Sequence, residues 1–238
     1  MIDLITTATS KDEAERGAAI AVLPVGSFEQ HGDYLPLATD TIVACVVARE
    51  LGRAYPVMVL PPISISCSHE HAGWRGTVSI SARTLHDVVT DIATSLAASG
   101  VERLVLVNGH GGNYVLANIA QEASVHGPRI GVFPQGADWE RARRDARIQT
   151  DNHEDMHAGE LETSILLATY PGVIRPGNET ADWLADDRPH LLTLGMARYT
   201  KSGVIGRPSL GTKDKGIAVL ASLVASFESL FSVLSARD

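Results

Sequence analysis

Four short apolar runs alternate with helical segments, and this alternation most constrains the fold. The runs cover residues 19–23, 57–60, 104–107 and 130–133. Segments with a helical apolar stripe follow at 40–53, 81–99 and 114–126. Continuously apolar strands separated by helices are typical of a parallel sheet covered on both faces, with right-handed crossovers. We therefore expect an α/β protein with a three-layer α/β/α sandwich and a mainly parallel sheet.

No internal repeat or linker divides the 238 residues, so we expect a single domain over 1–238. A further helix is expected at 160–169, followed by an irregular stretch rich in Gly and Pro at 173–213. An apolar stripe from Ile217 to Leu234 predicts a final helix that packs on the core.

The composition of the chain disfavours several classes of binding partner. The net charge of −8 disfavours nucleic acid. The arginines of 141–147 alternate with acidic residues, which indicates a solvated helix face rather than a phosphate site. Two cysteines imply no disulfide framework, and we find neither a signal segment nor a run of 18 apolar residues. We expect a cytoplasmic protein that does not bind a membrane.

One cluster of polar residues follows the first apolar run. Glu29 and His31 are two apart in an extended stretch, so their side chains leave the backbone on the same side. Asp40 stands where the next helix begins. Two carboxylates and an imidazole suit a divalent ion such as Zn, Mn or Fe, which indicates a hydrolase.

A second polar segment, Asn108–Asn113, directly follows the third apolar run. The carboxyl ends of parallel strands lie at one edge of a sheet, where ligands bind. Considered alone, His110 could be an ordinary loop histidine or a ligand, and the neighbouring metal ligands favour the second interpretation. Its Gly-His-Gly-Gly context matches neither a dinucleotide nor a Walker pattern.

Three long segments then resemble the signatures of one family, in the same order along the chain. They are Pro24–Asp40, Asn108–Asn113 and His157–Ser164. The chain resembles the creatininase family of metal-dependent amidohydrolases from about Ala19 to Ser164, with a weaker trace over 202–211. The resemblance implies that Asp40 bridges two ions, that Glu29 and His110 bind one, and that His31 binds the other.

The chain departs from creatininase at Gly112, where that enzyme has a glutamate that completes the second metal site. Glu160 and Glu162 are the candidate replacements. They point about 200° apart on a helix, so both cannot face one ion. We prefer Glu160, which lies one turn from His157 on nearly the same face.

His157 matches the catalytic histidine of the family, and an imidazole can pass a proton at neutral pH. Its expected task is to protonate the leaving nitrogen. His69 and His71 follow the second strand and are expected to border the substrate pocket. Glu154 and Gly111 are further candidates for substrate contact.

The expected reaction is therefore hydrolysis of a carbon–nitrogen bond by a metal-bridging hydroxide. The substrate is a small amide or short peptide. A formamide-type intermediate or a precursor peptide is favoured over creatinine, because Gly112 replaces the family glutamate. The resemblance also implies a homo-oligomer, and hexamers occur in the family. The alternative is a non-catalytic metal protein that binds a small ligand or peptide.

Overall fold

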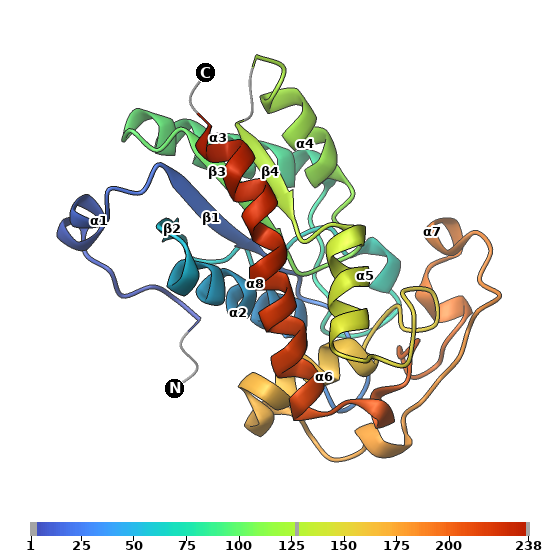
Figure 1. Ribbon diagram of the computed structural model, residues 1–238. Helices are drawn as coiled ribbons and strands as arrows, with labels where there is room; N and C mark the ends of the chain where they lie inside the picture. Colours follow the sequence, from blue (N-terminus) through green and yellow to red (C-terminus); the bar gives the residue numbers. More distant parts are fainter. Residues whose placement is uncertain (1–3, 127–128, 237–238) are drawn as a thin grey trace.

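The computed structural model describes residues 4–126 and 129–236, and it is a three-layer α/β/α sandwich (Figure 1). The ends of the predicted domain 1–238 and residues 127–128 lie outside the described residues. The four strands are β1 (Ile20–Val25), β2 (Val57–Val59), β3 (Arg103–Asn108) and β4 (Ile130–Phe133). They form one parallel sheet, as the apolar runs predicted, and the strand order is β2-β1-β3-β4.

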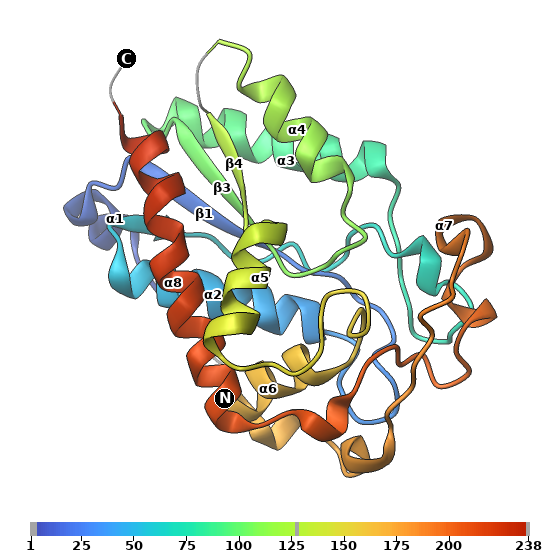
Figure 2. The same cartoon turned by 45° about the vertical axis from the view of Figure 1, so that its right-hand side comes forward.

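Alternate side chains along the strands point to opposite faces of the sheet and pack into two separate hydrophobic cores. Val22 and Val105 face the core made with α2 (Thr39–Ala54), α5 (Gly136–Asp145), α6 (Glu160–Thr169) and α8 (Lys213–Ser235). Leu23 and Leu106 face the opposite core, under α3 (Ala82–Ala98) and α4 (Val115–Ala123). Burial on both faces explains why the strands read as continuous apolar runs. Figure 2 shows α3 and α4 on one side of the sheet and α8 on the other.

The register of the sheet brings the two polar segments together. Val25, the last residue of β1, lies opposite Asn108, the last residue of β3. The Gly109 amide also donates to the Val25 carbonyl at 2.9 Å. The loops that carry Glu29 and His110 therefore start side by side, at the carboxyl edge where ligands bind in such sheets.

The stretch predicted to be irregular contains only short helices. They are η2 (Pro171–Val173), η3 (Asn178–Thr180), α7 (Leu191–Leu194), η4 (Met196–Arg198) and η5 (Pro208–Leu210). Two more elements lie earlier in the chain: α1 (Ser10–Arg16), and η1 (His69–His71) in the loop that follows β2. Figures 1 and 2 show α7 near the carboxyl edge of the sheet.

The predicted solvated arginine face needs a correction at Arg143. This side chain is 7% exposed, whereas its neighbour Arg144 is exposed. The Arg143 guanidinium donates to the Asp155 carboxylate at 3.2 Å and to the Thr150 carbonyl at 3.2 Å. Arg143 is buried because it lies on the inner face of α5, where its guanidinium contacts the buried carboxylate of Asp155.

The final helix, α8, is long and apolar enough to cross a membrane by length and composition alone. Its buried side chains pack against other elements of the protein, as the apolar stripe predicted. Val219, Leu223 and Phe227 belong to the core shared with α2 and α6. The core helix of a globular protein passes the same test of length and composition.

Candidate metal centre and active site

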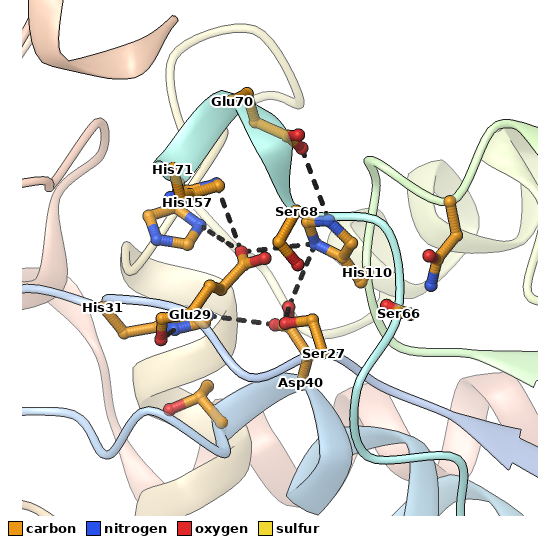
Figure 3. A network of polar contacts seen from close by, with 12 residues as sticks. Ser27, Glu29, His31, Asp40, Ser66, Ser68, Glu70, His71, His110 and His157 are labelled. Carbon is orange, nitrogen blue, oxygen red and sulfur yellow. Dashed lines mark hydrogen bonds and ion pairs between the residues drawn. The ribbon is translucent and has the colours of Figure 1, made fainter. Parts of the chain in front are cut away.

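Four segments of the chain bring carboxylates and imidazoles to one place at the carboxyl edge of the sheet. Figure 3 shows Glu29, His31, Asp40 and His110 around this place. Glu29 and His31 come from the loop after β1, and His110 comes from the loop after β3. Asp40 lies in the first turn of α2 and Glu162 in the first turn of α6. Glu29 and His31 are fully buried, and Asp40 is 1% exposed.

Two groups of possible ligands share Asp40. In the first, His110 Nδ1 lies 3.3 Å from Glu29 Oε1 and 3.0 Å from Asp40 Oδ2. In the second, His31 Nε2 lies 3.0 Å from Asp40 Oδ1 and 3.8 Å from Glu162 Oε1. Each carboxylate oxygen of Asp40 thus faces a different group. Both groups are compact enough to hold a metal ion, because their ligand atoms lie within 4.8 Å of one another.

Backbone carbonyls orient both imidazoles. His31 Nδ1 lies 3.0 Å from the Glu29 carbonyl, and His110 Nε2 lies 2.9 Å from the Cys67 carbonyl. A carbonyl can only accept, so the proton of each ring sits on that nitrogen. In the neutral ring the other nitrogen, which faces the carboxylates, carries the lone pair and is therefore the nitrogen that could bind an ion. Histidines that bind metals are oriented in this way.

The buried carboxylate of Glu29 indicates that the centre suits a cation. It is fully buried, and neither of its oxygens accepts a hydrogen bond from a described residue. Burial, together with the nearby charge of Asp40, raises the pKa of Glu29 to about 8. A buried carboxylate without a partner is costly unless a cation compensates it. This donor set therefore fits divalent metal ions.

The crowding of charged groups also shifts the pKa values of Glu162 and His31. Burial raises the pKa of Glu162 to about 7, and the charge of Asp40 adds to the shift. For His31, burial opposes the charged form, but the Asp40 carboxylate outweighs burial and raises the pKa to about 10. Three acidic groups crowd around two imidazoles, and an ion in each group would relieve their repulsion.

The structure places Glu162, rather than the preferred Glu160, beside His31. The Glu160 carboxylate accepts hydrogen bonds from the Thr150 amide at 3.0 Å and the Thr150 hydroxyl at 2.8 Å. It also pairs with the ammonium group of Lys215 on α8. Glu162 faces His31 instead, while its Oε2 accepts from the Ala158 amide at 2.6 Å. The two residues diverge around α6 as predicted, and Glu162 is the one that belongs to a compact group of possible ligands.

His157, the predicted catalytic residue, lies beside this centre. Its Nε2 donates to the Gln30 carbonyl at 2.6 Å, which leaves the lone pair on Nδ1, 3.7 Å from Glu29 Oε1. A backbone bridge to Ile205 holds the residue, and the next residue, Ala158, has a φ of 55°. Burial keeps the pKa of His157 well below its ordinary value. Such backbone strain beside a functional group is typical of active sites.

The four candidates for substrate contact separate into two pairs. His71 and Gly111 line a cavity of about 370 Å³ together with Asp40, His157 and Glu162. His71 also approaches the centre itself, with Nε2 3.2 Å from Glu29 Oε1. His69 does not line this cavity, and its Nδ1 contacts the Ser79 hydroxyl at 3.0 Å. Glu154 pairs with Arg207 at 3.5 Å and does not line the cavity either.

Sequence reasoning overlooked three residues that support the centre. Ser27 donates to Asp40 Oδ2 at 2.6 Å, and Gln30 Nε2 donates to His71 Nδ1 at 2.9 Å. Glu70 Oε1, from the loop that carries His69 and His71, lies 3.3 Å from His110 Nε2. The sequence does contain a hint for Gln30. Side chains alternate in an extended stretch, so Gln30 should point to the side opposite Glu29 and His31, where it can support the loop instead of joining the ligands.

Comparisons with known proteins identify the family. The sequence profile of creatininase, described as creatinine amidohydrolase, matches residues 5–231. The chain belongs to the creatininase family. A creatininase-family relative, the mycofactocin precursor peptide peptidase of Mycobacterium ulcerans (strain Agy99), is 35% identical over 85% of this chain and 80% of its own length. Creatinine amidohydrolase of Pseudomonas putida is 26% identical over 86% and 85%.

Solved creatininase structures share the fold. A crystal structure of creatinine amidohydrolase has a TM-score of 0.81 at 24% identity and covers 97% of each chain. Solved creatininases also include a manganese form and a Zn–Zn form of a variant. The family, the α/β architecture and the class of hydrolase acting on carbon–nitrogen bonds are therefore confirmed, and the described residues include groups able to hold metal ions.

Proposed function

We propose that this chain cleaves an amide bond in a short peptide at a centre of two divalent metal ions. One observation carries the proposal: Asp40 is shared by two compact ligand groups, and the buried Glu29 beside it has no hydrogen-bond partner among the described residues. Glu29, Asp40 and His110 would hold one ion. His31, Asp40 and Glu162 would hold the other. Zn and Mn are the leading candidates, and Fe remains a third because these ligand types also suit it.

When bound, the ions would polarise the substrate carbonyl and lower the pKa of a water molecule. The chain itself supplies proton transfer. The Gln30 carbonyl fixes the tautomer of His157 and leaves the lone pair of Nδ1 directed toward the centre. His157 would take a proton at Nδ1 and then deliver it to the leaving nitrogen, as a general base and then a general acid. Because burial keeps the pKa of His157 well below its ordinary value, its Nδ1 is free to accept a proton near neutral pH, and the imidazolium that forms gives this proton up readily to the leaving nitrogen.

The proposed substrate class rests on the cavity and on the relatives. Met156, Leu191 and Leu192 line the cavity beside the centre, and Arg188 adds a cation. Apolar surface and one charged group can bind a peptide side chain together with a carboxylate. The relatives named mycofactocin precursor peptide peptidase are more similar to this chain than creatinine amidohydrolase is. Gly112, in place of a glutamate, also argues against creatinine.

A metal-reconstitution experiment tests this function. The metal-free protein would be loaded with Zn, Mn or Fe and supplied with short peptides, creatinine or an N-formyl aminopyrimidine. We expect hydrolysis of peptides that depends on added metal, with products identified by mass spectrometry. Hydrolysis of the formyl compound alone would move the substrate to the formamide class. Two bound ions without hydrolysis of any of these compounds would favour the non-catalytic binding protein.

We also propose that the protein is a cytoplasmic homo-oligomer. The resemblance to a family that contains hexamers supports the assembly, and the low cysteine content fits a reducing compartment. Analytical ultracentrifugation would test the assembly, and fractionation of the source cells would test the location. A monomer at micromolar concentration would contradict the first part.

A further inference from the structure

Glu70 reaches the centre from η1, a segment that supplies none of the proposed metal ligands. Its Oε1 lies 3.3 Å from Nε2 of His110, and its side chain is 14% exposed. Figure 3 shows this contact on the side of the imidazole that faces away from Asp40. The Cys67 carbonyl approaches the same nitrogen at 2.9 Å. Two acceptors thus surround the nitrogen of His110 that does not face the metal centre.

This arrangement separates the two nitrogens of His110 by function. Nδ1 faces Glu29 and Asp40, so it is the nitrogen that can bind an ion. Nε2 carries the proton, and both the Cys67 carbonyl and the Glu70 carboxylate can accept it. A carboxylate against the distal N–H of a histidine fixes the ring and raises its strength as a ligand. A carbonyl alone does so less strongly, since it carries no net charge.

Gly112 is what allows Glu70 to take this position. A methyl group at residue 112 would overlap Oε1 of Glu70 and also Nε2 of His110. The glutamate that the family resemblance places at 112 therefore cannot coexist with Glu70 as it stands here. A carboxylate from η1 occupies the space that a side chain from the His110 loop would otherwise fill.

We propose that Glu70 is a positioning residue that holds His110 as a metal ligand, and that the glycine at 112 is required for this role. The inference rests on the proposed metal centre. Glu70 is not itself a ligand in this arrangement, because it lies beyond the imidazole and belongs to no compact group of possible ligands among the described residues. Its removal should weaken one metal site without removing a ligand.

Zinc affinity measured by competition with a chelating dye tests the proposal directly. We expect Glu70→Ala to weaken the affinity of one site by roughly 10- to 100-fold, with two ions still bound at saturation. Glu70→Gln should lose less, because the amide oxygen can still accept the Nε2 proton. Gly112→Ala should weaken the affinity at least as much as Glu70→Ala, since its methyl group overlaps both the Glu70 carboxylate and Nε2 of His110. Glu122→Ala is the matched control, because Glu122 contacts His86 at 3.2 Å on the surface.

A second measurement shows whether Glu70 orients the His110 imidazole or only contributes to the stability of the fold. In the zinc-loaded protein, the Nε2 proton of His110 should give a slowly exchanging NMR signal that shifts in Glu70→Gln. This variant also carries the test if Glu70→Ala does not fold. Unchanged affinity in both Glu70 variants would overturn the inference, and a loss of one ion in Glu70→Ala would make Glu70 a ligand instead. Failure of the unmodified protein to bind zinc would instead refute the metal centre itself.

Discussion

Glu160 and Glu162 lie two residues apart in the first turn of α6, and their carboxylates serve different parts of the molecule. Glu160 pairs with Lys215 of α8 and accepts from Thr150, whereas Glu162 lies 3.8 Å from His31. The buried ion pair ties α6 to α8 next to the centre. One glutamate therefore belongs to the structural framework, and its neighbour belongs to the proposed metal site.

This division predicts opposite effects of two matched substitutions. Glu162→Gln should bind one metal ion instead of two and lose most activity, with little change in the stability of the metal-free protein. Glu160→Gln should keep both ions but lose about 2 kcal/mol of unfolding free energy, because the partly buried ammonium group of Lys215 loses the carboxylate that pairs with it. Elemental analysis and chemical denaturation measure the two effects. Loss of an ion in Glu160→Gln would restore the sequence-based preference for that residue.

Removal of metal should reveal the cost of the buried Glu29 carboxylate. In the metal-free protein, Glu29→Gln should raise the melting temperature or leave it unchanged, because burial already disfavours the charged form of Glu29, whose pKa is raised to about 8, and the amide carries no charge. In the metal-loaded protein the same variant should be less stable than the unmodified chain, since a ligand is lost. Calorimetry with and without a chelator checks this change of sign. Destabilisation of similar size in both states would argue against a metal at Glu29.

His157 and His69 provide a matched pair of histidines for the chemistry. His157→Ala should lower kcat by roughly 10²- to 10⁴-fold, the range for loss of a general acid or base, while both ions remain bound. His69→Ala should change kcat by less than about threefold, because His69 does not line the cavity of the centre. Turnover numbers and metal content measured on the same samples test this. A loss of metal in His157→Ala would assign His157 to the ligands.

The buried Arg143 predicts a large structural effect beside the site. Its partner Asp155 also accepts from the Glu160 amide at 2.6 Å and the Leu161 amide at 3.0 Å, so it caps α6. Arg143→Ala should cost about 3 kcal/mol, because it leaves that carboxylate buried without its cation. Arg144→Ala, at an exposed neighbouring position, should stay within about 0.5 kcal/mol. Equal stability of the two variants would contradict the buried ion pair.

The sequence by itself determined the parallel sheet, the helices that cover it and the family. Apolar runs and helical stripes depend on local burial, so they locate strands and helices without knowledge of the contacts between them. The strand ends also placed Glu29, His31, Asp40 and His110 at one edge, since parallel strands share a direction. The family signatures did the same for His157.

Only the tertiary structure decided how neighbouring acidic and basic groups were paired. Spacing showed that Glu160 and Glu162 diverge, but the choice between them depended on Lys215, which is distant in sequence. The burial of Arg143 and the approach of Glu70 to His110 depended on partners from other segments in the same way. The periodicity of a helix or strand determines the face on which a residue lies. The free energy of a buried charge depends instead on the partner that the folded chain brings next to it, and that partner comes from a distant part of the sequence.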